Sequence, residues 1–533
     1  MIEISINNVK KTFGFKNVLD GINFEIKTGE RVSLIGDNGC GKSTLIKIIC
    51  GEESADTGNI SIRKNASIGY LCQQPEEIYN NELVKEILYK SDTKLLELSN
   101  KLKRYEEKMK ESSNDIKIVN KYLNTQEKYM NLGGYELDTL IDKVSHGLKI
   151  DNLLDSKFNI LSGGEQKRVL LASLIIKKSD ILILDEPTNH LDIDTLEWLE
   201  QFLNKFNGTI LMVTHDRYFL DKVSTKTILI ENGKSYTFYG NYSYYLKENE
   251  LRIEKEFQEY KDQQKEIEAM KKKIKQLQEF GKLAYPGGEP FFKRAESIKK
   301  RLEKIELKNK PITKKELPIN LSFDKRSGKD VLKIKNYDLY IESQKLIENI
   351  NIDISYGENA CLIGENGCGK STLIKKIIEN NCDKIIIGTN IKIGYIPQQI
   401  SFKEDIRVID YAKKFFSGEE SHLRSALAKF YFHGDFVLKK INKLSGGEKV
   451  RLKLFELINN KSNFIIMDEP TNHLDIYTKE TLEEALDKFK GTILFISHDR
   501  YFINKLATKI FYIDNKNIKE YQGNYDYFIN HKK

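Results

Sequence analysis

The chain has 533 residues, of which 40% are hydrophobic and 31% are charged, and its 86 basic and 78 acidic residues give a formal net charge of +8. This composition excludes collagen-like, disulfide-scaffold and wholly disordered proteins, and the length suits two to four domains. The longest apolar runs, such as 181–184 and 464–467, are far shorter than the ~20 residues of a membrane-spanning helix, so we expect no membrane domain.

The first residues contain no apolar stretch typical of a secretion signal, and the six cysteines are scattered without metal-ligand spacing. We therefore expect a cytoplasmic protein with reduced thiols and without a zinc or iron–sulfur site.

Five motifs of the first half return in the second half in the same order. The 23 positions from Ser162 to Asp185 also separate Ser445 from Asp468. This repetition predicts two copies of one α/β domain, at 1–241 and 316–533. The motif pairs are 36–43 and 364–371, 161–165 and 444–448, 185–192 and 468–475, 214–219 and 497–502, and 240–242 and 523–525.

The first motif, G-x-x-x-x-G-K-S, lies between an apolar segment that reads as a strand and one that reads as a helix. Glycines in such a loop let backbone N–H groups converge on phosphates at the positive end of the helix. We predict that Lys42 and Lys370 hold the β- and γ-phosphates of ATP and that Ser43 and Ser371 bind Mg²⁺. The other predicted ATP-binding loop residues are Gly36, Asn38, Gly39, Gly41, Thr44, Gly364, Asn366, Gly367, Gly369 and Thr372.

Two glutamines are candidates for contacting both the γ-phosphate and Mg²⁺, namely Gln73 and Gln398. Each has a glutamine neighbour, Gln74 or Gln399, so the assignment within each pair stays open. For stacking on adenine, the first half offers 13 or 15, both phenylalanine, and the second half offers no clear candidate.

The first copy carries an insert at about 95–140, since 126 positions separate Gly36 from Ser162 but only 81 separate the equivalent glycine and serine of the second copy. Leu95, Leu98 and Leu102 begin a helical apolar pattern, and a polar break at 112–115 precedes a second helical stretch. The insert is predicted to be a charged helical hairpin.

The segments Ser162-Gly163-Gly164 and Ser445-Gly446-Gly447 open predicted helices and form a second anion-binding end in each domain. One nucleotide in one domain does not need both ends. Two domains that face head to tail do, because the Ser-Gly-Gly segment of one half then caps the ATP held by the other. We expect the protein to be a monomer whose two halves pair within the chain.

The acid at the end of each apolar strand, Asp185 or Asp468, is expected to meet Mg²⁺. The next residue, Glu186 or Glu469, is placed to polarise the attacking water. Two histidines, each 30 positions beyond the aspartate, are expected to contact the γ-phosphate or to orient that glutamate. These histidines are His215 and His498.

The segment 242–315 differs from both copies in composition. Two apolar stripes at helical spacing, beginning at Ile253 and Phe291, predict two long antiparallel helices. The first helix would reach ~50 Å. Glycines and prolines at 281–292 predict the turn at its tip.

The paired LSGGE segments, phosphate loops and late histidines resemble the ATP-binding cassette (ABC) superfamily. The doubled DEPTNHLD segment, the tandem halves and the charged interdomain helices resemble its ABC-F branch. The resemblance implies ATP and Mg²⁺ as cofactors and the 70S ribosome as partner. It implies binding at the 50S E site, with the linker near 23S rRNA and P-site tRNA, and no membrane or DNA partner.

The tip combines apolar, aromatic and basic residues, so it is expected to do more than bind phosphates. Its aromatic residues are candidates for stacking on bases or crowding a drug pocket, or they merely cap the helix pair. The tip residues are Leu283, Tyr285, Pro286, Phe291, Phe292, Lys293 and Arg294.

Our hypothesis is an ABC-F ATPase that protects the ribosome from antibiotics acting at the peptidyl-transferase centre, with hydrolysis driving its release. The alternatives are a housekeeping ABC-F translation factor and a tandem ATPase subunit of a transporter. The transporter reading leaves the long charged hairpin without a purpose.

Overall fold

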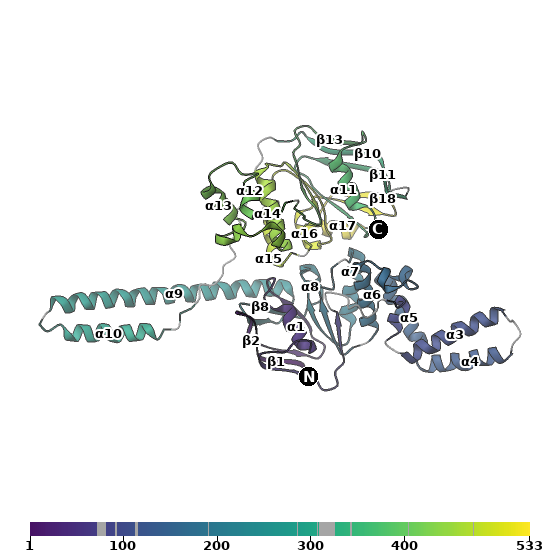
Figure 1. Cartoon of the computed structure of the whole chain (residues 1–533), viewed down its shortest axis with the longest axis horizontal. Coiled ribbons are helices and arrows are strands. Elements are labelled where there is room, and N and C mark those ends of the chain that lie inside the picture. The colour runs from purple at the N-terminus through teal and green to yellow at the C-terminus, as the bar shows by residue number, and fades with distance from the viewer. Residues whose placement is uncertain are drawn as a thin grey trace. The chain divides into compact units, whose positions relative to one another are not determined.

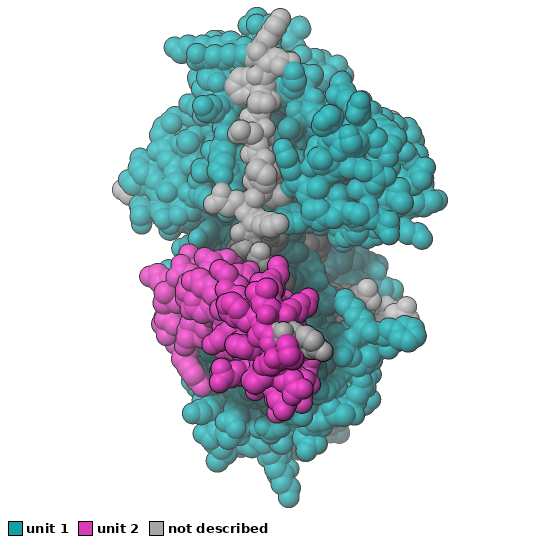
Figure 2. Space-filling model, turned by 90° about the vertical axis from the view of Figure 1, so that its left-hand side faces the viewer, with its two compact units in different colours: residues 1–237, 317–533 teal, residues 238–316 magenta. Residues whose placement is uncertain are grey.

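The computed structural model describes residues 1–71, 81–90, 93–111, 116–177, 179–189, 191–284, 286–305, 307–308, 326–341, 344–402, 404–472 and 474–532. The chain divides into two compact units: unit 1 comprises Met1–Thr237 with Leu317–Lys533, and unit 2 is Phe238–Glu316 (Figure 2). The sequence predicts the linker at 242–315, close to unit 2. In the part of the chain that is described, no helix is long and apolar enough to cross a membrane.

The first half of unit 1, which we call the first cassette, combines a three-stranded antiparallel sheet of order β2-β1-β4 with a six-stranded sheet of order β5-β6-β7-β3-β8-β9. Its strands are β1 (Ile2–Phe13), β2 (Lys16–Lys27), β3 (Arg31–Ile35), β4 (Thr57–Ile62), β5 (Ile68–Leu71), β6 (Ile181–Asp185), β7 (Thr209–Val213), β8 (Lys226–Glu231) and β9 (Lys234–Phe238). Its α-helices are α1 (Lys42–Cys50), α2 (Val84–Tyr89), α3 (Thr93–Glu111), α4 (Ile116–Asn131), α5 (Gly134–Gly147), α6 (Gly163–Ile176), α7 (Ile193–Lys205) and α8 (Arg217–Val223).

The second half, the second cassette, repeats this architecture with sheets of order β11-β10-β13 and β14-β15-β16-β12-β17-β18. Its strands are β10 (Asp330–Ile341), β11 (Gln344–Ser355), β12 (Asn359–Gly364), β13 (Ile385–Ile387), β14 (Ile393–Ile396), β15 (Phe464–Asp468), β16 (Thr492–Ile496), β17 (Lys509–Asp514) and β18 (Asn517–Tyr521). Its α-helices are α11 (Lys370–Glu379), α12 (Val408–Ala412), α13 (Glu420–Ala428), α14 (Gly446–Asn459), α15 (Ile476–Asp487), α16 (Arg500–Leu506) and α17 (Tyr525–His531). The two tandem α/β cassettes confirm the predicted fold class.

The central strands of each large sheet are parallel and covered on both faces. Every residue of β6 and β15 is buried, which explains their continuous apolar sequence. Parallel strands end at the same edge of a sheet, so the loops after β3, β6 and β7 meet there. This edge collects the phosphate loop, the Asp-Glu pair and the histidine.

The insert of the first cassette contains the two predicted helices, α3 and α4, and these pack on each other. Leu95, Leu102 and Tyr129 form the buried centre of the hairpin. A third helix, α5, follows directly, and the sequence pattern did not predict it. The polar break at 112–115 lies outside the described residues.

Unit 2 is an antiparallel pair of helices of unequal length, α9 (Tyr242–Leu283) and α10 (Glu289–Glu303), with α10 running back along α9 (Figure 1). Ile267 of α9 and Ala295 of α10 are buried. Beyond α10, Lys308 pairs with Glu259 at 2.7 Å. The predicted stripes therefore face each other across the pair.

The predicted turn at 281–292 is too long, because α9 continues to Leu283 and α10 starts at Glu289. Proline is tolerated in the first turn of a helix, so Pro290, the second residue of α10, does not break it. At 42 residues, α9 is about 63 Å long over its whole length. The backbones approach closely at the turn, since a Cβ added to Gly288 would lie 2.0 Å from the Gly281 carbonyl oxygen.

We expect Gly288→Ala to loosen the end of the hairpin by about 1–3 kcal/mol, because the added methyl group overlaps backbone. Amide hydrogen exchange of the full-length protein measures this effect as faster exchange in α10. Ser297→Ala on the exposed side of α10 is the control. Equal exchange in Gly288→Ala and wild type would contradict the close approach.

Candidate active site

Both phosphate loops turn sharply into their helices at a glycine. Gly41 and Gly369 have φ of +105° and +104°, in the left-handed region. A Cβ on Gly41 would lie 2.6 Å from a methyl carbon of Leu19, and one on Gly369 would lie 3.0 Å from a methyl carbon of Leu346. Glycine is thus required at each position for two reasons. The backbone conformation disfavours other residues, and neighbouring side chains leave no room for a Cβ atom.

The loop lysines have the same environment in the two cassettes. Lys42 Nζ donates to the carbonyls of Gly36 at 2.6 Å and Asp37 at 3.0 Å. Lys370 Nζ donates to the carbonyls of Gly364 at 2.8 Å and of the next residue at 2.7 Å. Each lysine is largely buried, so a fixed positive charge lies over a loop of backbone N–H groups. This arrangement suits a polyphosphate.

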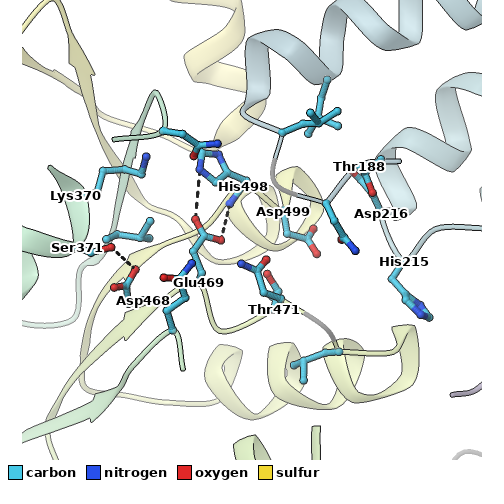
Figure 3. A pocket seen from close by; sticks show the side chains of 18 of the residues that line it. Thr188, His215, Asp216, Lys370, Ser371, Asp468, Glu469, Thr471, His498 and Asp499 are labelled. Carbon is cyan, nitrogen blue, oxygen red and sulfur yellow. Dashed lines mark hydrogen bonds and ion pairs between the residues drawn. The ribbon is translucent and has the colours of Figure 1, made fainter. Parts of the chain in front are cut away.

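The second cassette brings together oxygen groups of the kind that Mg²⁺ prefers. Ser371 Oγ donates to Asp468 Oδ1 at 3.1 Å, and Gln398 lines the same cavity (Figure 3). Burial raises the pKa of Asp468. Among the described residues there is no group of three or more His, Cys, Asp or Glu side chains that could hold a metal ion. A site with one carboxylate fits Mg²⁺ shared with nucleotide phosphates.

In the first cassette, Ser43 is the second residue of α1, and Asp185 is the last residue of β6. Gln73 is outside the described residues. In the second cassette, Gln398 lines the large cavity and Gln399 is not among its lining residues, which favours Gln398 within the open pair.

Each glutamate that follows the strand aspartate has an unusual backbone. Glu186 and Glu469 have φ of +53° and +48°. Their amides donate to the carbonyls of Val213 at 2.8 Å and Ile496 at 3.0 Å, which holds the turn in place. Such a conformation costs about 1–3 kcal/mol in a residue other than glycine, and its presence in both cassettes points to a functional constraint.

Each glutamate faces the histidine of its own cassette. Nε2 lies 3.5 Å from Oε1 in both His215–Glu186 and His498–Glu469. In the second cassette, the backbone amide of His498 also donates to Glu469 Oε2 at 3.3 Å (Figure 3). The structure therefore assembles both predicted glutamate–histidine pairs.

Burial controls the charge of these groups. It raises the pKa of both Glu186 and Glu469 to about 7, and it lowers the pKa of both His215 and His498 to about 3. The histidines are therefore neutral at pH 7. A carboxyl group with a pKa near 7 can accept a proton at neutral pH, as a general base must.

A cavity of about 620 Å³ connects groups from both cassettes and has a size suited to a nucleotide. Figure 3 shows Lys370, Glu469 and His498 on one side and His215 with Asp216 on the other. The first cassette contributes Asn38, Glu186, Thr188, Asn189, Leu191, Leu196, His215 and Asp216, and the second contributes the loop residues Asn366, Gly367, Gly369, Lys370, Ser371 and Thr372.

The cavity also includes Ile341, a residue that the sequence did not single out. Ile341 pairs with Gln344 at the end of its hairpin, as Phe13 pairs with Lys16 in the first cassette. Ile341 thus holds the position of one of the two predicted adenine-stacking residues. Phe13 is 49% exposed and Phe15 is fully exposed.

The Ser-Gly-Gly segments open α6 and α14 as predicted. Ser162 and Ser445 are the N-cap residues, and each forms a capping box with the glutamate three positions later. Neither segment is among the residues that line the large cavity. The capping of one half's ATP by the other half's Ser-Gly-Gly stays a prediction.

Contacts between the cassettes are made by residues that the sequence did not indicate. Lys149 Nζ lies 2.5 Å from Glu365 Oε1 in the opposite phosphate loop and 3.0 Å from Asp192 in its own cassette. Two buried ion pairs, Arg217–Glu483 and Arg500–Glu200, cross between the cassettes. Both pairs use equivalent positions of the two repeats. Their repetition in the sequence was the signal that could have identified them.

At the tip of unit 2, Leu283 is 83% exposed and Phe292 is 42% exposed. The Phe291 ring lies 6.3 Å from that of Phe280 and is half-buried, so it caps the helix pair. Pro286, Lys293 and Arg294 are exposed. Tyr285 is outside the described residues.

A family model described as ABC transporter matches residues 19–189 and 347–472, and another with that description matches residues 228–321. A Bacillus subtilis (strain 168) protein named YdiF is 39% identical and covers 100% of this chain and 83% of its own length. ABC transporter F family member 2 of Arabidopsis thaliana is 34% identical, covering 99% of this chain and 78% of its own. The ATP-binding protein Uup of Escherichia coli (strain K12) is 32% identical, covering 98% and 82%.

Two solved structures share the fold. The archaeal ribosome recycling factor aABCE1, in complex with ribosomal stalk protein aP1, has a TM-score of 0.61 at 17% identity and covers 96% of this chain and 89% of its own. A model of ribosome-bound archaeal Pelota and ABCE1 has a TM-score of 0.55 at 18% identity, covering 97% and 78%.

We expect Glu186→Gln and Glu469→Gln each to leave one competent site, and the double variant to lose about 10²–10⁴-fold in ATP turnover while still binding ATP, because only the candidate base is removed. Phosphate release and nucleotide binding by purified protein measure both effects. Glu379→Gln, an exposed change, is the control. Undiminished turnover in the double variant would exclude these carboxylates as the bases.

Proposed function

Because the chain belongs to the ABC transporter family and has the tandem architecture of its ABC-F members, we propose that it is a cytoplasmic ATPase that binds the ribosome and protects it from antibiotics. ATP hydrolysis is the activity of the ABC ATP-binding domains of this family. We propose in addition that the partner is the ribosome, that the protein binds the E site of the 50S subunit, and that binding protects against the drugs.

The cavity shared by both cassettes supports a cycle of closing and opening. Lys42 and Lys370 would hold the phosphates, and Ser, Asp and Gln oxygens at 43, 185, 371, 398 and 468 would hold Mg²⁺, which when bound neutralises phosphate charge. Gln73 joins this set by its place in the repeat. The Ser-Gly-Gly helix start of one cassette would cap the triphosphate held by the other, so closure would follow ATP binding and release would follow hydrolysis.

The glutamate–histidine pairs supply the proton chemistry in this proposal. Glu186 or Glu469 accepts the proton of the attacking water through a carboxylate oxygen. The neutral histidine, 3.5 Å away, orients that carboxylate and faces the γ-phosphate. A neutral imidazole can donate a hydrogen bond without adding a competing charge at the base.

The observation that carries the ribosome proposal is the helical hairpin of unit 2, whose 42-residue helix has an exposed apolar end. Residues 247–310 contain 18 basic and 13 acidic residues, a net charge of +5 of the +8 of the whole chain. Basic helices suit the phosphates of rRNA, and an exposed leucine and phenylalanine suit bases or a drug. We propose that the hairpin lies against 23S rRNA and P-site tRNA, near the peptidyl-transferase centre.

The solved structures that share the fold lend support. One is named a ribosome recycling factor and another is a ribosome-bound ABCE1. Both share the tandem cassettes with this chain. Two cassettes that close on ATP are thus compatible with a ribosome-associated cycle.

Glu186→Gln/Glu469→Gln is expected to trap the protein on ribosomes, because ATP closes the cassettes and no hydrolysis reopens them. Co-sedimentation with 70S ribosomes in ATP measures the bound fraction, with Glu379→Gln as the control. If the trapped variant never sediments with ribosomes while it still binds ATP, the ribosome proposal is wrong.

Leu283→Ala/Phe292→Ala is expected to lower the antibiotic concentration at which expressing cells grow, with ribosome binding retained, because these exposed side chains lie at the tip. Drugs that act at the peptidyl-transferase centre are the relevant set. Leu251→Ala, an equally apolar change on the same helix, is the control. Ribosome binding without any change of susceptibility from wild-type expression would instead indicate a housekeeping translation factor.

A further inference from the structure

The two cassettes differ at one buried position of the helix that follows the DEPTNHLD segment. Asp192 and Asp475 are the N-cap residues of α7 and α15. Four positions later, the first cassette has Leu196 and the second has Lys479. Both side chains are buried and both line the shared cavity.

Lys479 joins the histidine loops of the two cassettes. Its Nζ donates to the backbone carbonyl of His215 at 3.0 Å and to Asp499 Oδ2 at 2.8 Å. His215 faces the candidate base of the first cassette, and Asp499 directly follows His498 and caps α16. One ammonium group of the second cassette therefore touches the catalytic loop of each half.

The surrounding contacts are nearly symmetric, so the difference is local. Arg217 pairs with Glu483 and stacks on Tyr501 at 4.1 Å, while Arg500 pairs with Glu200 and stacks on Tyr218 at 4.3 Å. These contacts hold both histidine loops against the opposite cassette, and Arg500 also lies 3.7 Å from Asp216 of the loop at 215. Only the loop that contains His215 also accepts a hydrogen bond from Lys479 of the opposite cassette. The equivalent residue of the first cassette, Leu196, has no donor.

We propose that Lys479 is a positioning residue that makes the two ATP sites inequivalent, because it ties the catalytic loop of the first-cassette site to the second cassette. This inference rests on the proposed roles of Glu186 and Glu469. The first-cassette site would then hydrolyse ATP only when Lys479 of the second cassette holds the loop that contains His215. At the second-cassette site the equivalent position is Leu196, whose side chain has no donor.

The test introduces Lys479→Met into two proteins that each keep one competent site. The Glu469→Gln protein keeps the first-cassette site, and the Glu186→Gln protein keeps the second-cassette site. Misplacing a catalytic loop by an ångström costs up to about 10²-fold. Adding Lys479→Met is expected to lower kcat about tenfold or more in the Glu469→Gln protein. The loss is expected to be several-fold smaller in the Glu186→Gln protein, and KM for ATP should change little in both. Lys479→Arg should restore most of the loss, and the exposed change Lys490→Met should affect neither protein.

Equal loss in both single-site proteins, or no loss in either, would overturn the inference. Thermal unfolding shows whether Lys479→Met is folded, and Lys479→Gln replaces it if it is not. These assays contain purified protein and ATP without ribosomes, so their result is independent of ribosome binding. A different result would show that Glu186 and Glu469 are not the catalytic bases. In that case the Glu186→Gln/Glu469→Gln variant would keep full ATP turnover.

Discussion

Two buried arginines, each paired with a glutamate of the opposite cassette, are the contacts on which the shared cavity depends. Arg217 and Arg500 are almost completely buried, and each also stacks on a tyrosine of the other half. Removing one partner of such a pair leaves an uncompensated buried charge, which costs about 3–5 kcal/mol. The pairs therefore specify one register of the two cassettes, whatever their net contribution to stability.

That register explains how duplicated sequence becomes a composite site. Each arginine lies two positions after its cassette's histidine, and each partner glutamate lies on the helix after the DEPTNHLD segment. The pairing thus brings the histidine of one half near the aspartates and helix of the other. Within this symmetric frame, leucine at 196 and lysine at 479 give the two halves different roles.

The hairpin of unit 2 follows a different principle. Its helices carry many charged side chains, and their contact is limited to a narrow apolar stripe with small residues at the turn. Gly281 and Gly288 allow the backbones to meet, so the tip is compact and α9 extends to Leu283. This compact end leaves Leu283 exposed and turns Phe291 inward, which divides the aromatic residues of the tip between packing and exposure.

The sequence by itself determined the two α/β cassettes, their phosphate loops, the Asp-Glu pairs, the histidines and the helical linker. These features depend on local patterns, namely glycine spacing, buried apolar strands and helical periodicity, and duplication reinforced each of them. Only the tertiary structure decided the turn at 284–288, the place of Ile341 in the cavity and the cross-cassette contacts of Lys149, Arg217, Lys479 and Arg500. A lone charged residue has no periodicity, and its partner lies more than 200 positions away in the chain, so its role depends on which surfaces the folded cassettes bring together.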